Sequence, residues 1–352
     1  MAKRARPVEI AQTDRLEGFA HPRESHRLIG QDAALARAAR AIRGGRPPQA
    51  WLIAGPPGIG KATLAYRIAR YLLAHGATAD GPADLSVPEN SSVAMQVAAA
   101  SHPGLLVLKR GAHPETGKLM TILSVAEIRR LGGFFGMTSG AGGWRVAIVD
   151  TADDMNDAAA NALLKLLEEP PSRAMLLLVA NVPGRLLPTI RSRCQRLDLR
   201  PLDPNVLETE LAHLLPELDA KARAALARLS GGSLGMALQL AGGEGVGLAR
   251  EAERLIEQAA SPDIAALLAF ADRLYRIADG LGTFGSFLTQ ALAERIRERA
   301  PLDAAKLDRW VGAWEMLNAS FARAAGLHLE PRQTVLGAAR ILGDAARRAG
   351  RL

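Results

Sequence analysis

The chain has 352 residues, a net charge of +8 and 48% hydrophobic but only 4% aromatic residues, so aliphatic side chains must fill the cores of two or three domains. No apolar run approaches the roughly 18 residues of a transmembrane helix, and the basic start lacks the apolar segment of a secretory signal, so we expect a cytoplasmic protein without a membrane partner. The single cysteine, Cys194, excludes an intrachain disulfide framework and a zinc site built from several cysteines.

The first predicted elements are a polar arm, a helix, a short strand and a second helix. Residues 1–25 are polar and interrupted by prolines, which predicts a loose N-terminal arm. Helical spacing begins within 28–42, residues 51–54 are an apolar run, and apolar positions from 64 to 73 mark one face of a helix that Gly76 ends. The segment GPPGIGKATLA at 55–65 therefore has the strand–turn–helix setting of a phosphate-binding loop.

Strands and helices continue to alternate as far as residue 200. Apolar runs at 104–108, 144–150 and 174–181 predict buried strands. One helix is expected from Ser124, which has capping-box spacing to Glu127, and another over the apolar positions from 155 to 167. Buried strands alternating with amphipathic helices are typical of a parallel sheet with helices on both faces, so we predict an α/β P-loop domain over residues 26–200.

After Pro201 the strand signals end and helical segments follow one another. We predict a small helical domain over residues 201–243 and a helical C-terminal domain over residues 244–352. The charge balance is +9 for residues 1–200 and −1 for residues 201–352. This leaves two interpretations open: nucleotide or nucleic acid bound on the N-terminal side only, or a solvated arginine-rich surface. The expected helices include 204–215, 219–229, 234–241, 247–260, 263–278, 283–299 and 303–325.

The loop at 55–65 lacks one part of the G-x-x-x-x-G-K-[ST] motif. Gly55, Gly60 and Lys61 match, but Ala62 replaces the hydroxyl that binds Mg²⁺, and Thr63 lies about 100° further around the helix. The residues leave open whether the loop holds ATP or ADP without hydrolysing it. The candidate nucleotide-binding residues are Gly55, Pro56, Pro57, Gly58, Ile59, Gly60, Lys61, Ala62 and Thr63, together with Asp150 at the end of a strand.

A hydrolase also needs a group that activates water next to the strand that ends in Asp150. The residue after Asp150 is Thr151, which cannot act as a base near neutral pH. Asp153 and Asp154 follow, and we expect them to cap the next helix. Catalysis by the chain's own loop is therefore not expected.

The arginines of TIRSRCQRL, residues 189–197, allow two interpretations. Residue types alone favour a solvated basic edge. The alternative is an arginine that enters a neighbouring subunit's active site and stabilises charge on the transferred phosphoryl group. Cys194 is interpreted as a small buried apolar residue.

Together these segments resemble the clamp-loader branch of the AAA+ ATPases, the subunits that serve bacterial DNA polymerase III. The resemblance is strong over residues 25–200, weaker in the helical lid, and at the C-terminus rests mainly on GLHLEPRQTVL (326–336). It implies an AAA+ P-loop domain, a helical lid over 201–243 and a C-terminal collar over 244–352 that joins a hetero-pentamer. The segments that carry it are LIGQ (28–31), GPPGIGKATLA (55–65), GGWRVAIVDTADDMN (142–156), NALLKLLEEPPSR (161–173) and NVPGRLLPTIRSRCQRL (181–197).

Within this branch the chain resembles the stator, a subunit without ATPase activity in a DNA-directed DNA polymerase complex. Gly235 stands where the motor subunits have an arginine that senses the γ-phosphate, so a third hydrolytic group is missing besides those replaced by Ala62 and Thr151. The Ser-Arg-Cys motif implies that Arg193 acts in trans on a motor subunit. The complex would open a sliding clamp and close it around primer–template DNA.

One departure concerns zinc, because many relatives carry a four-cysteine module that this chain lacks. Residues 76–101 contain no cysteine, so we expect no zinc and an apolar mini-core involving Val93, Met95 and Val97.

Two other functions stay open: an ATP-hydrolysing motor subunit of the same complex, and a DNA-remodelling AAA+ ATPase. Turnover by the isolated chain would favour the first, and a C-terminal DNA-binding domain would favour the second.

Overall fold

The computed structural model describes residues 16, 18–111, 120, 122–136, 143–242, 244–277, 280–299, 304–327 and 329–350. Most of the predicted arm, residues 1–15, lies outside these ranges. The described chain divides into two compact units, the first comprising Met1–Leu214 with Gly231–Met236 and the second Leu215–Ser230 with Ala237–Leu352. The domain boundaries proposed after residues 25, 200 and 243 stay predictions.

Within the described residues, the first unit is built on a parallel sheet of five strands in the order β2–β3–β4–β1–β5. The central strands β1 and β4 are buried along their whole length, as expected where helices cover both faces of a sheet. The apolar runs predicted as strands are confirmed as β1 to β4. The strands are β1 (Ala50–Ala54), β2 (Leu105–Leu108), β3 (Arg145–Val149), β4 (Ala174–Ala180) and β5 (Gln195–Asp198).

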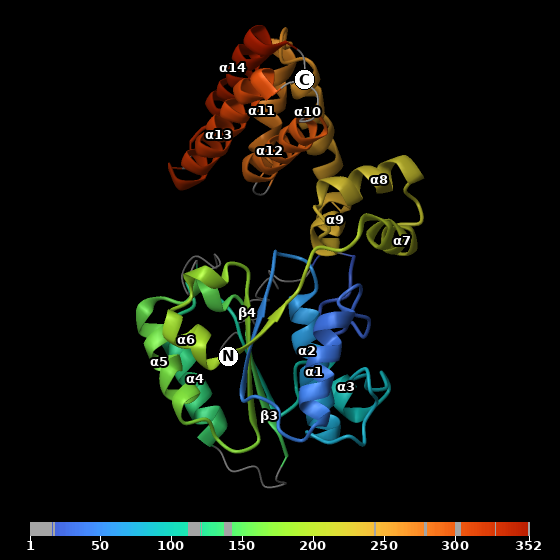
Figure 1. Cartoon of the computed structure of the whole chain (residues 1–352), viewed down its shortest axis with the longest axis vertical. Helices are drawn as coiled ribbons and strands as arrows, with labels where there is room; N and C mark the ends of the chain where they lie inside the picture. Colours follow the sequence, from blue (N-terminus) through green and yellow to red (C-terminus); the bar gives the residue numbers. More distant parts are fainter. Residues whose placement is uncertain are drawn as a thin grey trace, which may run out of the picture. The chain divides into compact units, whose positions relative to one another are not determined.

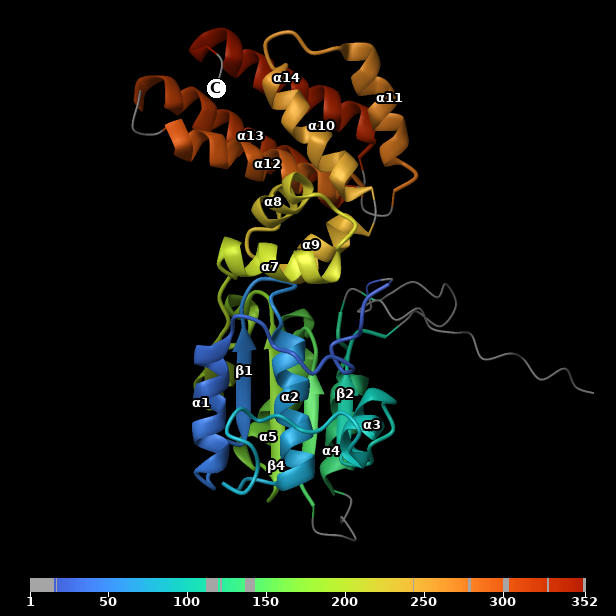
Figure 2. The ribbon, with the colours of Figure 1, turned by 90° about the vertical axis from the view of Figure 1, so that its right-hand side faces the viewer.

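Alternate side chains of the strands pack into separate cores on the two faces of the sheet. Figure 1 shows helices on both sides of this sheet. Trp51 and Ile53 of β1 belong to one core, and Ala50 and Leu52 belong to the other. Figure 2 looks onto the face covered by α1, α2 and α3. This arrangement confirms the predicted α/β class. The helices are α1 (Asp32–Arg43), α2 (Lys61–His75) and α3 (Ser92–Ala98) on one face, and α4 (Val125–Gly136), α5 (Asp157–Glu168) and α6 (Pro188–Arg193) on the other.

The edge strand β5 was not predicted. Its sequence is Gln-Arg-Leu-Asp, and among these side chains Leu197 is the buried one. A four-residue edge strand with a single apolar residue has too little periodicity to be recognised from sequence.

The prediction that Asp153 and Asp154 cap the helix after β3 is wrong. The cap of α5 is Asn156, whose side chain accepts a hydrogen bond from the Ala159 amide at 2.9 Å. Both aspartates lie in a short 3-10 turn, η1 (Ala152–Asp154), which ends before the helix starts. Asp153 instead accepts hydrogen bonds from backbone amides directly after β4, and so ties the ends of β3 and β4 together.

Among the described residues the segment expected to form a mini-core in place of a zinc module forms no separate core, because its buried residues join the large core that also contains Trp51 and Ile53. Val97 is fully buried and Val93 packs against the same core, but Met95 is 56% exposed. Residues 93 and 97 share one face of α3, whereas residue 95 points to the other side of the helix. Among the described residues no group of three or more His, Cys, Asp or Glu side chains is arranged to hold a metal ion.

The second unit is helical, as predicted, and its core contains a chain of aromatic contacts. The rings of Phe270 and Phe284 are 4.8 Å apart and those of Phe284 and Phe321 are 6.1 Å apart. None of the described helices is long and apolar enough to span a bilayer. The helix α14 lies in the C-terminal region predicted to be helical, although its bounds were not predicted. The unit contains α8 (Ala220–Leu229), α10 (Gly245–Glu257), α11 (Ile264–Leu274), α12 (Gly280–Arg299), α13 (Ala304–Leu327) and α14 (Pro331–Ala349); α7 (Pro204–Leu214) belongs to the first unit, and α9 (Leu234–Ala241) starts in the first and continues in the second.

Candidate functional site

The phosphate-loop sequence connects β1 to α2 at the carboxyl edge of the sheet. Gly58 and Gly60 have φ values of 73° and 100°, which residues with a Cβ rarely adopt. Lys61 is the first residue of α2. Asp150 directly follows β3, and so reaches the same edge of the sheet as the loop. Ligands of open parallel sheets bind at this edge, so the fold brings the predicted nucleotide-binding residues together.

The ammonium group of Lys61 is turned onto its own loop. Its Nζ atom donates hydrogen bonds to the carbonyl oxygens of Gly55, at 2.7 Å, and Pro56, at 2.5 Å. The residue is only 5% exposed. Burial lowers the lysine's pKa to about 8, although the negative charges of Asp150 and Asp153 oppose this shift. An ammonium group engaged by these carbonyls has fewer donors left for a phosphate.

The segment that starts α9 lies directly on the loop. The Gly235 amide donates to the Gly58 carbonyl at 2.8 Å, and the Ser233 hydroxyl donates to the Pro57 carbonyl at 2.8 Å. A Cβ atom on Gly235 would lie 2.8 Å from the Cα atom of Gly58, so the backbones touch because both residues are glycines. From the sequence, Gly235 was recognisable as the replacement of an arginine but not as a residue that packs on the loop.

The buried side chain of Gln31 holds the loop from the other side. Its amide group donates to the carbonyl oxygens of Ile59, at 3.2 Å, and Arg200, at 2.8 Å, and its oxygen accepts from the Arg200 amide. The residue is 4% exposed. The segment LIGQ contributed to the family resemblance, but its glutamine had no predicted role. A buried amide with these partners fixes the loop to the chain that follows β5.

Two groups needed for hydrolysis are absent from this site. Ala62 and Thr63 lie in the first turn of α2, where Ala62 has no hydroxyl to offer. Thr151 has a left-handed φ of 56°, unusual for a β-branched residue. Its hydroxyl donates to the Asp150 carbonyl at 2.7 Å. The side chain that follows Asp150 is therefore engaged by backbone, and it carries no negative charge that could activate water.

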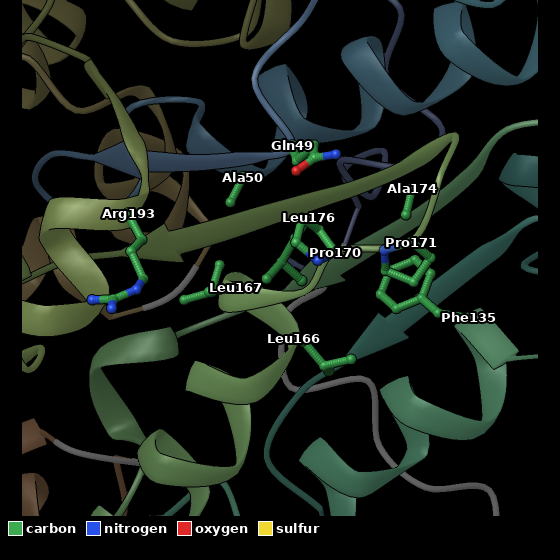
Figure 3. A pocket seen from close by; sticks show the side chains of 10 residues that line it. All are labelled: Gln49, Ala50, Phe135, Leu166, Leu167, Pro170, Pro171, Ala174, Leu176 and Arg193. Carbon is green, nitrogen blue, oxygen red and sulfur yellow. The ribbon is translucent and has the colours of Figure 1, made fainter.

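Arg193 lies at the amino ends of the strands, opposite the carboxyl ends where the phosphate loop lies. It ends α6, and it lines a cavity of about 110 Å³ together with Gln49, Ala50 and Ala174, which lie where β1 and β4 begin (Figure 3). The phosphate loop follows the other end of β1. At about 3.3 Å per residue, the five residues of β1 separate the two edges by roughly 15 Å. The structure therefore does not bring Arg193 together with the chain's own loop.

The backbone around Arg193 is anchored by its neighbours. Ile190 is fully buried and Cys194 is 9% exposed, so α6 is fixed on both sides of the exposed arginine. The burial of Cys194 confirms the interpretation as a small buried apolar residue, and this burial raises the pKa of its thiol to about 12. The guanidinium group of Arg193 donates to the Glu168 carboxylate at 2.9 Å and to the Thr189 carbonyl at 3.2 Å. Glu168 was not recognised from the sequence.

Comparisons of the sequence with known proteins find similarity to subunits of bacterial DNA polymerase III. Residues 30–203 match the family model described as DNA polymerase III, delta subunit. DNA polymerase III subunit delta' of Pseudomonas aeruginosa is 40% identical over 193 residues, covering 54% of this chain and 55% of that protein. The corresponding Escherichia coli K12 protein is 35% identical over 204 residues, covering 58% of each chain.

A more distant relative carries another subunit name. DNA polymerase III subunit gamma/tau of Mycobacterium tuberculosis H37Rv is 32% identical over 195 residues, covering 53% of this chain and 30% of that protein. The chain thus spans little more than half the length of the delta' relatives it matches.

Proposed function

We propose that the chain belongs, through residues 30–203, to the DNA polymerase III delta subunit family and is the delta' subunit of a clamp loader. In this role it does not hydrolyse ATP. It joins other subunits of the complex in a hetero-pentamer through its C-terminal helices. The assembled complex loads a sliding clamp onto primer–template DNA.

The state of the phosphate loop carries the proposal of a subunit without ATPase activity. Lys61 is buried against the loop's own carbonyl oxygens. Gly235 stands in place of the arginine that senses the γ-phosphate, and it packs directly on Gly58, so it has no side chain that could reach a phosphate. Ala62 offers no Mg²⁺ ligand and Thr151 no base. Each difference weakens one step of hydrolysis, and together they support a loop that serves mainly as structure.

The position of Arg193 supports a role in trans. The residue is exposed at the edge of the sheet remote from its own loop, so a nucleotide that it contacts must belong to another molecule. An arginine supplied in this way stabilises charge on the transferred phosphoryl group and accelerates the reaction by roughly 10³–10⁵-fold.

The first experiment measures Mg²⁺–ATP binding and hydrolysis by the purified chain, using a labelled nucleotide. We expect no turnover. Turnover above that of a Lys61→Ala control would contradict the proposal and favour the alternative of an ATP-hydrolysing motor subunit. The same result would reopen the alternative of a DNA-remodelling ATPase, which DNA-stimulated turnover would identify.

The second experiment replaces Arg193 in the assembled complex. We expect Arg193→Ala to lower the ATPase rate without preventing assembly, and Lys61→Ala to leave the rate nearly unchanged. Arg191→Ala is the matched control, because Arg191 is also an exposed arginine of α6. An unchanged rate with Arg193→Ala would count against the trans-acting role, and a large loss with Lys61→Ala would mean that the loop still works.

A further inference from the structure

We propose that Glu168 is a positioning residue that orients the guanidinium group of Arg193 before a neighbouring subunit docks. The inference rests on the proposed trans-acting role of Arg193. Glu168 is the last residue of α5 and Arg193 is the last residue of α6. Their side chains meet in an ion pair of 2.9 Å between Nη2 and Oε1.

Both partners of this pair stand on a fixed backbone. Two prolines, Pro170 and Pro171, follow the end of α5 and prevent the helix from continuing. Ile190 and Cys194 anchor the backbone of α6 in the core. Glu168 is therefore presented at a constant position, against which the long side chain of Arg193 can be oriented.

The contacts hold the guanidinium group on one side and leave the other side accessible. Glu168 and the Thr189 carbonyl accept from its two terminal nitrogens, and the side chain is 38% exposed. Figure 3 shows the guanidinium group directed away from the apolar wall formed by Phe135, Pro170 and Pro171. A guanidinium group has several N–H donors in a planar fork, so donors remain for a phosphate oxygen.

The expected benefit is a side chain that is ordered before docking. Arginine has large rotamer freedom, and fixing it beforehand reduces the entropy lost when it meets its target. Exposed ion pairs shift an equilibrium by up to about five-fold. A pair of this strength orients the arginine but still lets it move toward a more highly charged phosphate group.

The test uses steady-state ATPase kinetics of the assembled complex with Mg²⁺–ATP. We expect Glu168→Ala to lower kcat by about two- to five-fold with KM for ATP unchanged. Glu168→Gln keeps an oxygen acceptor of the same reach and should restore part of the rate. Glu169→Gln is the matched control, because Glu169 is the adjacent exposed glutamate and makes no ion pair within the described residues.

A double-mutant cycle separates positioning from a general structural effect. In the Arg193→Ala background, Glu168→Ala should have no further effect on kcat. An equal loss in both backgrounds, or no loss from Glu168→Ala where Arg193→Ala lowers the rate, would overturn the positioning role while leaving Arg193 in place. If Arg193→Ala itself changes nothing, the proposed function fails and this inference fails with it. Unchanged thermal unfolding of Glu168→Gln would show that its kinetics report on an intact fold.

Discussion

Replacing Gly235 by alanine should loosen the phosphate loop, although alanine is the better helix former. An added Cβ atom would lie 2.8 Å from the Cα atom and 3.0 Å from the carbonyl oxygen of Gly58. Both atoms are backbone, so no flexible side chain can move aside, and the 2.8 Å hydrogen bond from the Gly235 amide must lengthen. Overpacking of this kind costs about 1–3 kcal/mol, which exceeds the 0.5–1 kcal/mol or so that alanine contributes in a helix.

Gly132→Ala is the matched control, because it lies in α4 of the same unit and a Cβ atom there would meet no atom of the described chain within 4 Å. This control should stabilise the protein by about 0.5–1 kcal/mol. Urea unfolding followed by circular dichroism gives both free energies. Hydrogen exchange of the loop peptide then shows whether the change is local, with faster exchange expected for Gly235→Ala. A stabilisation by Gly235→Ala similar to that of the control would refute the close backbone contact.

Three further predictions follow from buried polar groups. Because the pKa of Lys61 is about 8 when folded and about 10.5 when unfolded, the unfolded chain binds more protons between these values. The unfolding free energy should therefore rise with pH across this window, by roughly 3 kcal/mol, and equal pH profiles for the parent and Lys61→Met would contradict the shift. Arg70→Met should lower the unfolding free energy by about 2–4 kcal/mol, because Arg70 is only 2% exposed and its guanidinium group donates to two backbone carbonyls. Arg37 is exposed, so Arg37→Met is the control, and an equally small effect of both substitutions would contradict this prediction. Cys194, with its pKa raised to about 12, should resist a thiol reagent at pH 8 until urea unfolds the chain, and rapid labelling of the native protein would show that the thiol is accessible.

The α/β class and most of the elements could be predicted from the sequence because they depend on local patterns. Continuous apolar runs predicted β1 to β4, and apolar spacing and a capping box predicted α1, α2, α4 and α5, whereas the short helix α3 was not predicted. The loop at 55–65 was recognisable because its glycines and lysine stand at fixed spacing between a strand and a helix. The replacements at Ala62, Thr151 and Gly235 are likewise visible in the sequence, since each concerns which atoms a residue carries.

The partners of these residues were decided by the tertiary structure. Glu168 lies 25 positions before Arg193, and Gly235 lies 177 positions after Gly58, so no periodic pattern connects either pair. Asp153 was predicted to cap a helix on local grounds. Because β3 and β4 are neighbours in the sheet, its carboxylate instead accepts hydrogen bonds from two backbone amides that follow β4. The sequence by itself determined which groups the site possesses and lacks. In the folded sheet the loop lies at the carboxyl ends of the strands and Arg193 at their amino ends, because parallel strands place their two ends on separate sides of the domain.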